Sequence, residues 1–218
     1  ENAQAAAKRD KQAIAAIMEG LVLSGIAMSY IGNSRPASGS EHHMSHYWEM
    51  MFLLDHAPDP LHGTKVGIGT VMAIRLYEML KEKKDQLVPV KDFSFALEQW
   101  KDEIKNAYGP AAGGVLTLED KTGKNSKEEV SRRTEVFCRE KEKIWKIIDE
   151  LPDAEKIAEV LKSMEAPFYP DQIQVSSEVF KRGIFYAKDL RDRFGLLQIL
   201  FDFGLQEEFS QRLIEEVY

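Results

Sequence analysis

An all-α fold is predicted by three features of the sequence. Apolar residues recur at spacings of three and four along most of the chain, a pattern typical of amphipathic helices. No segment shows the convincing period-two alternation of a half-buried strand, and no internal repeat is evident. The hydrophobic share of 44% in 218 residues suffices for a buried core, so the sequence predicts a single multi-helix domain over residues 1–218.

The first part of the chain predicts three long helices. The helix expected over residues 3–31 loses its polar face in its second half, so we expect protein to surround that half on most sides. Its most apolar stretch, residues 21–31, is too short and interrupted to cross a bilayer, which takes ~20 apolar residues. Residues 32–40 predict a loop, since glycine, serine and proline dominate them. Further helices are predicted over residues 41–54 and 63–81.

The second part of the chain predicts shorter helices and one loop. The expected helices cover residues 92–107, 126–148, 153–164, 176–187 and 193–203. Gly204 is expected to cap the last of these helices. Residues 108–125 are rich in glycine and lie between charged segments, so we predict a surface loop or insertion there.

The charge and the cysteine content narrow the class of protein. A net charge of −7 repels phosphate backbones and anionic membranes, so nucleic-acid binding and membrane insertion are not expected. The one cysteine, Cys138, cannot form a disulfide within the chain, which favours the reducing cytoplasm. The chain begins with neither methionine nor a signal-peptide pattern, and we expect it to be a piece of a longer protein.

All five histidines lie between positions 42 and 62. His42 and His46 are four residues apart, so they lie on one face of the predicted helix, and His62 precedes a glycine where the next helix begins. Imidazole is the commonest metal ligand, but the zinc-hydrolase pattern H-E-x-x-H is absent. The nearest acids are Asp55 and Glu41, the latter expected as a helix N-terminal charge. These residues alone leave open both a metal site and an incidental cluster.

Two stretches around these histidines resemble a known family, and they read SRPASGSEHHMSH and LHGTKVGIGT. They are similar to the C-terminal, metal-binding half of glycerol-1-phosphate dehydrogenases, in the iron-containing alcohol dehydrogenase and dehydroquinate synthase-like superfamily. The superfamily shares H-x-x-x-H followed by a helix start of the L-H-G kind. The resemblance is good over residues 14–80 and thinner over residues 186–208, which read YAKDLRDRFGLLQILFDFGLQEE.

The resemblance implies a metal-dependent oxidoreductase. It gives His42 and His62 the role of metal ligands and His46 that of a substrate contact. The implied cofactors are a divalent zinc, nickel or iron ion together with NAD(H) or NADP(H). The implied reaction interconverts dihydroxyacetone phosphate and sn-glycerol 1-phosphate by hydride transfer, and members of the family often form homo-oligomers.

The loop before the histidines adds a possible phosphate contact. Arg35 offers a planar donor fork suited to phosphate, and Ser34 and Ser38 could line a small anion site near a helix start. The family match gives His43 and His56 no role, so we expect them to be surface or packing residues.

Two parts of the family pattern are missing from this sequence. The family's third metal ligand, an aspartate, and its glycine-rich nucleotide loop both belong to an N-terminal α/β domain that we do not find here. We therefore expect the helical C-terminal domain of a longer enzyme, inactive alone. The alternatives are a dehydroquinate synthase-like lyase, another polyol dehydrogenase of the superfamily, or a non-catalytic helical interaction module.

Overall fold

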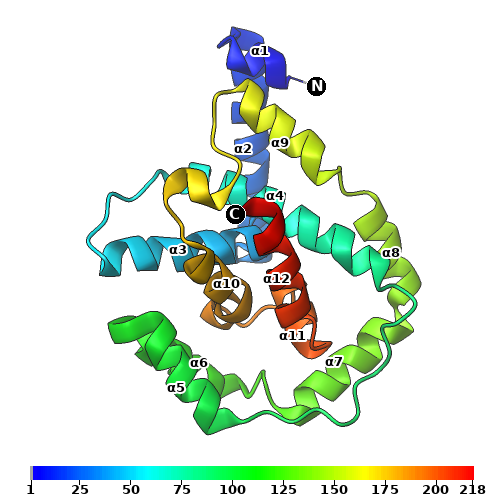
Figure 1. Ribbon diagram of the computed structural model, residues 1–218. Helices are drawn as coiled ribbons and strands as arrows, with labels where there is room; N and C mark the ends of the chain where they lie inside the picture. The colour runs from blue at the N-terminus through cyan, green and yellow to red at the C-terminus, as the bar shows by residue number, and fades with distance from the viewer. Residues whose placement is uncertain (1) are drawn as a thin grey trace.

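The computed structural model describes residues 2–218, and in that range it contains helices and no strand (Figure 1). The prediction of an all-α fold is confirmed. The α-helices are α1 (Ala3–Ala7), α2 (Lys11–Ile31), α3 (Ser40–Leu54), α4 (His62–Glu82), α5 (Leu97–Tyr108), α6 (Ala112–Thr122), α7 (Lys127–Arg139), α8 (Lys141–Asp149), α9 (Ala154–Ser163), α10 (Ser177–Tyr186), α11 (Leu196–Asp202) and α12 (Gln206–Val217). Short 3₁₀-helices are η1 (Arg35–Ala37), η2 (Gly109–Ala111), η3 (Pro170–Ile173) and η4 (Ala187–Leu190).

Helices α3 and α4 form the centre of the molecule. Each buries an apolar stripe at helical spacing, which is why these segments fold as helices here. Helix α10 packs against α3, while α9 and α12 pack against α4, so the centre is covered from several sides. The fully buried side chains at this centre include Met44, Tyr47, Trp48, Ile68, Val71, Met72 and Leu76.

Helices α5 to α8 form an arc around one side of this centre (Figure 1). The single helix predicted over residues 126–148 is two helices, because the backbone at Glu140 leaves helical geometry with φ −96° and ψ 11°. This break lets both Phe137 and Trp145 turn inward, where their rings meet edge to face at 5.9 Å. The edge-to-face contact between these rings stabilises the bent arrangement of α7 and α8.

The prediction of a surface loop over residues 108–125 is wrong. Residues Ala112–Thr122 form α6, which packs against α5 and η4 and buries Val115. Gly113 and Gly114 sit within this helix although glycine weakens helices, because the neighbouring contacts outweigh that preference. Lys124 and Asn125, at the end of the expected loop, are among the most buried polar residues of the chain.

Several predicted helix ends also differ from the structure. The helix expected from residue 92 begins at Leu97, and the one expected from residue 193 begins at Leu196. Gly204 follows α11 with a left-handed φ of 67°, which confirms the expected cap. Helix α12 was not predicted, although it packs against α4 and α10.

The first predicted helix is divided and is far more exposed than expected. Asp10 separates α1 from α2, because its carboxylate accepts hydrogen bonds from the backbone N–H groups of Gln12 and Ala13, both at 3.0 Å. Figure 1 shows α2 rising from the helical body towards α1. Ala13 is its one buried residue, so the expectation that protein surrounds the second half is wrong for this structure. By length and composition alone, the whole of α2 is long and apolar enough to cross a membrane. Residues 21–31, the stretch considered from the sequence, are too few to do so.

A buried polar network fastens the end of α6 to η4. Lys124 donates hydrogen bonds to the carbonyl oxygens of Lys188 (2.7 Å) and Arg191 (3.0 Å). Lys188 donates to Asp189 (2.7 Å) and to the side-chain oxygen of Asn125 (2.9 Å). Buried polar groups persist only when they are hydrogen-bonded, so this network fixes the path of the chain through residues 188–191.

The pKa of Lys124 is lowered to about 8, mainly because burial disfavours its charged form. The unfolded chain therefore holds this proton between about pH 8 and pH 10.5, while the folded chain has released it. The free energy of unfolding is expected to rise across that range by up to about 3 kcal/mol relative to the Lys124→Met variant. Denaturant titrations at stepped pH values measure this difference.

The matched control is Lys121→Met, which removes an exposed lysine from the end of α6, three residues before Lys124. Its stability should differ from that of the unchanged chain by an amount that does not vary with pH. A pH-independent difference for Lys124→Met as well would show that the buried ammonium group stays charged.

Candidate metal centre

Helices α3 and α4 bring together the three histidines that the sequence analysis selected. His42, His46 and Glu49 occupy positions i, i+4 and i+7 of α3, which lie on one face of a helix. His62 is the first residue of α4 and faces them across the turn between the two helices. Its ring centroid lies 5.4 Å from that of His42 and 5.3 Å from that of His46.

Each of the three imidazoles is held by a carboxylate through its Nδ1 atom. His42 donates to Glu41 at 2.9 Å, and His46 donates to Glu49 at 2.9 Å. His62 donates to the other oxygen of Glu49 at 2.7 Å. Since an ionised carboxylate accepts only, these contacts place the hydrogen on Nδ1 and leave Nε2 as the lone-pair nitrogen.

Glu49 is therefore the residue that ties the cluster together. Burial acts to raise its pKa, but hydrogen bonds from His62 and His46 and the charge of Lys65 outweigh burial and lower it. Glu49 consequently stays ionised at neutral pH and keeps both rings oriented. The buried Lys65 lies 3.5 Å from Glu49 and also pairs with Asp59, so a fixed positive charge balances this carboxylate.

The cluster has the chemistry of a site for a divalent metal ion. Within residues 2–218, no hydrogen bond engages the Nε2 atoms of His42, His46 or His62. Imidazoles that bind metals usually donate their other N–H to a carboxylate, as these three do. A second possible set of metal ligands consists of His46, Glu49 and His62, because one ligand atom from each lies within 4.8 Å of the other two. The set predicted from the sequence is His42 and His62.

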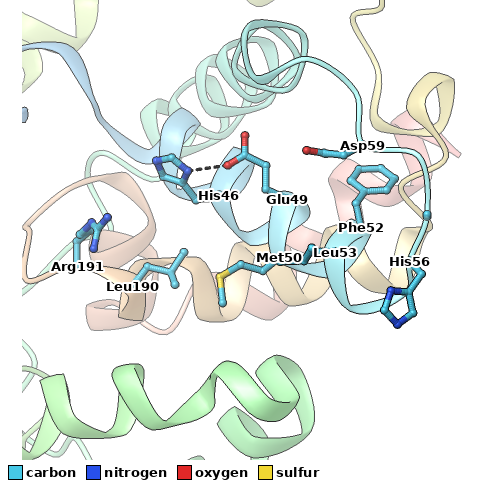
Figure 2. Close-up of a pocket in the computed structure, with 10 residues that line it drawn as sticks. His46, Glu49, Met50, Phe52, Leu53, His56, Asp59, Leu190 and Arg191 are labelled. Atoms are coloured by element: carbon cyan, nitrogen blue, oxygen red, sulfur yellow. Dashed lines mark hydrogen bonds and ion pairs between the residues drawn. The ribbon is translucent and has the colours of Figure 1, made fainter.

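A cavity of about 670 Å³ adjoins His46 and Glu49 of the cluster (Figure 2). Figure 2 shows His46 and Glu49 joined by their hydrogen bond on one side, and Leu190 and Arg191 approaching from another element. The exposed His56 lines the far end of this cavity, away from the cluster. The cavity provides room for a small molecule beside the imidazole of His46.

The predicted phosphate residues lie around a different cavity. Arg35 and Ser38 line a space of about 530 Å³ next to the start of α3, together with His43. The hydroxyl of Ser34 instead accepts a hydrogen bond from Arg193 at 2.7 Å. His43 is a buried residue rather than a surface residue, with 5% of its surface exposed. Burial lowers its pKa to about 4, and the charges of Arg193 and Lys124 add to that effect.

Glu49 was not among the site residues predicted from the sequence. Glu41 and Asp55 were the acids considered there because they lie nearest to the histidines, and H-E-x-x-H is the one fixed metal-binding pattern compared with this stretch. The signal was present in the spacing, since an acid three residues after His46 shares its helix face. Asp55 is exposed beyond the end of α3 and takes no part in the cluster, whereas Glu41 binds His42 and also accepts from the N–H of Gly39 at 2.8 Å.

Comparison with curated proteins identifies relatives along most of the chain. A protein of Bacillus subtilis named glycerol-1-phosphate dehydrogenase [NAD(P)+] is 30% identical over 200 residues, which is 92% of this chain and 39% of that protein. Proteins of the same name from Halalkalibacterium halodurans and Methanosphaera stadtmanae are 48% identical over 84 residues and 51% identical over 61 residues. These segments cover 38% and 28% of this chain, and 21% and 16% of the relatives.

The chain thus spans well under half the length of the curated relatives that it matches. No family model matches the chain. No solved structure matches it either.

The meeting of the histidines depends on close packing between α3 and α4. A Cβ atom added to Gly69 in α4 would lie 2.6 Å from the backbone carbonyl oxygen of Glu41. A backbone atom cannot move aside as a flexible side chain can. The two helices can therefore approach this closely only with glycine at position 69.

Gly69→Ala is expected to lower the free energy of unfolding by about 1–3 kcal/mol, because the added methyl group forces α3 and α4 apart. The control is Gly114→Ala in α6, where a Cβ atom has open space within 4 Å. There alanine should stabilise the helix by roughly 0.5–1 kcal/mol. Denaturant titration of both variants measures the contrast, and equal effects would refute the close-packing argument.

Proposed function

Because the chain belongs to the family of the glycerol-1-phosphate dehydrogenases, we propose that it provides the metal- and substrate-binding half of such an enzyme. The reaction is hydride transfer between NAD(H) or NADP(H) and dihydroxyacetone phosphate, with sn-glycerol 1-phosphate as the alcohol. The observation that carries this proposal is the convergence of three imidazoles, each oriented by a carboxylate. We further propose a cytoplasmic location and a homo-oligomeric assembly.

His42 and His62 are the proposed metal ligands. Their rings are neighbours, and the carboxylates of Glu41 and Glu49 hold both of them by Nδ1. A zinc, nickel or iron(II) ion bound there would polarise a substrate carbonyl and stabilise the negative charge that develops on its oxygen. The remaining groups of the site bind and orient the substrate and move its proton.

His46 is the proposed proton carrier and substrate contact. Glu49 fixes its Nδ1–H, so Nε2 is the atom that can accept a proton from a substrate alcohol or return it to one. The ring is 39% exposed and lines the larger cavity, which gives a small substrate access to it. The carboxylate of Glu49 stabilises the imidazolium that results, because it lies 2.9 Å from the ring.

The ligand assignment can be tested by calorimetric titration of the metal-free chain with Zn²⁺ and with Ni²⁺. His42→Ala and His62→Ala are expected to abolish binding, since each removes one of the two ligands. His46→Ala is expected to retain it. His56→Asn is the control, because His56 is exposed outside the cluster and asparagine tolerates its left-handed φ of 51°.

The reverse result would change the assignment. Binding that survives in His42→Ala but is lost in His46→Ala would assign the metal to His46, Glu49 and His62. Binding unaffected by every substitution would place the metal outside this cluster and remove the main support for the proposed function.

Glu49→Gln is expected to weaken metal binding by about 10- to 100-fold, the usual effect of losing a group that orients metal ligands. Glutamine has a single accepting oxygen and no charge, so it cannot hold both His46 and His62. Asp55→Asn is the control, because this exposed carboxylate lies outside the cluster. Equal binding by the two variants, measured with the same titration, would show that Glu49 does not orient the site.

A further inference from the structure

Lys65 is a buried lysine near the start of α4, beside the candidate metal centre. None of its surface is exposed. Its ammonium group donates one hydrogen bond to the carboxylate of Asp59 and another to the carbonyl oxygen of Pro60, the latter at 2.5 Å. It also lies 3.5 Å from Oε1 of Glu49. One side chain of α4 therefore contacts both the turn that precedes its helix and the metal-site face of α3.

The charge of Lys65 acts on Glu49 with little screening. Figure 2 shows the carboxylate of Asp59 pointing towards Glu49, and the ammonium of Lys65 contacts both of these acids. An ammonium group has three N–H donors, of which the turn uses two, so the third is left for Glu49. Charges attract more strongly inside a protein than in water. Glu49 is therefore held towards Lys65.

Glu49 can serve a metal ion in one of two ways. In the structure its Oε1 accepts from His62 at 2.7 Å and its Oε2 from His46 at 2.9 Å, so it orients two imidazoles. The same carboxylate lies close enough to both rings to bind an ion directly together with them. The two roles compete, because a lone pair given to a metal ion no longer accepts a hydrogen bond.

Lys65 favours the orienting role of Glu49. Its ammonium lies beside Oε1, so an ion bound by this oxygen would come close to a positive charge and be repelled by it. The ammonium cannot withdraw, because Asp59 and Pro60 hold it and the whole side chain is buried. Glu49 is thus kept for the imidazoles.

We propose that Lys65 is a positioning residue that keeps Glu49 in its orienting role and out of the metal's ligand set. Lys65 thereby favours the set predicted from the sequence, His42 and His62, over the second possible set. His46, which belongs to the second set, then stays free to contact the substrate. The inference rests on the proposed function and adds to it the residue that decides which ligand set forms.

The first experiment removes the charge of Lys65 and determines which histidines Zn²⁺ then needs. Zn²⁺ is titrated calorimetrically into the metal-free chain. In the Lys65→Met background Glu49 is released to become a ligand, so His42→Ala is expected to weaken binding by less than about tenfold. In that background His46→Ala is expected to weaken it by more than about 100-fold, beyond the usual effect of losing an orienting group.

Three further variants control this experiment. Lys65→Arg restores a positive charge, so the requirement for His42 should return. Lys81→Met is the matched control, because it removes a lysine that pairs with Asp149 at the other end of α4. Lys65→Gln replaces Lys65→Met if that variant does not fold, since an amide still donates to Pro60 without carrying a charge.

Asp59→Asn separates the proposed role from a merely structural one. This substitution weakens the tie between Lys65 and the turn but leaves the ammonium beside Glu49. The expected result is an unchanged requirement for His42. If Asp59→Asn removed that requirement as Lys65→Met does, Lys65 would only hold the turn and the proposal would be wrong.

Nuclear magnetic resonance of the metal-free chain gives a second readout. The nitrogen chemical shifts of an imidazole report which ring nitrogen carries the hydrogen. Lys65→Met is expected to shift the signals of His46 and His62, because Glu49 bonds to both rings.

His42 is the internal control of this measurement, and its signal should stay unchanged. Glu41 holds its ring, and within residues 2–218 the only ion pair of Glu41 is with His42. A structural disturbance of the whole cluster would move this signal as well.

The outcomes separate this inference from the proposed function. Failure of the unchanged chain to bind Zn²⁺ would overturn the proposed function and the inference with it. Zn²⁺ binding that requires His42 in Lys65→Met as in the unchanged chain would overturn the inference alone. Signals of His46 and His62 that do not move in Lys65→Met would do the same.

Discussion

The backbone contact between α3 and α4 is the constraint on which the candidate site depends. Gly69 lets the carbonyl oxygen of Glu41 approach α4, and this approach sets the distance between the two helices. His42 and His46 stand on one helix and His62 on the other, so the distance between helices also sets the distance between rings. The candidate metal centre therefore depends on Gly69, which has no side chain and lies several residues away in the sequence from either proposed ligand.

Local spacing explains what the sequence could predict about this site. The grouping of His42, His46 and His62 follows from helical periodicity and one short turn. Both features can be recognised from residues that are close together in the sequence. Glu49 was equally accessible by its spacing, but a search for one known pattern passed over it. The pairing of Arg193 with Ser34 joins residues 159 positions apart, which no local pattern encodes. Arg35 and Ser38 of the cavity beside the start of α3 were singled out from the sequence, whereas the presence of His43 and Arg193 there was not.

The errors in the fold have two physical causes. Over residues 108–125, glycine content suggested a loop, but burial of Val115 and the Lys124 network stabilise a helix there, so tertiary contacts overrode local preference. For α2, the apolar composition correctly predicted a helix with surface to bury. Composition states how much apolar surface a helix carries, whereas burial depends on which other segments pack against it. The described residues cover little of α2, so the predicted burial was wrong here.

Glu41 connects the loop before α3 to the candidate metal centre. One of its oxygens accepts from both the N–H of Gly39 and the ring of His42, so the loop wall and the imidazole share a single anchor. A substrate hydroxyl that donated to this carboxylate would compete with those two donors for its lone pairs. Such a contact would then alter the hydrogen bond that orients His42, and with it the quality of that ring as a metal ligand. Substrate binding and metal ligation would in this way be coupled through one residue.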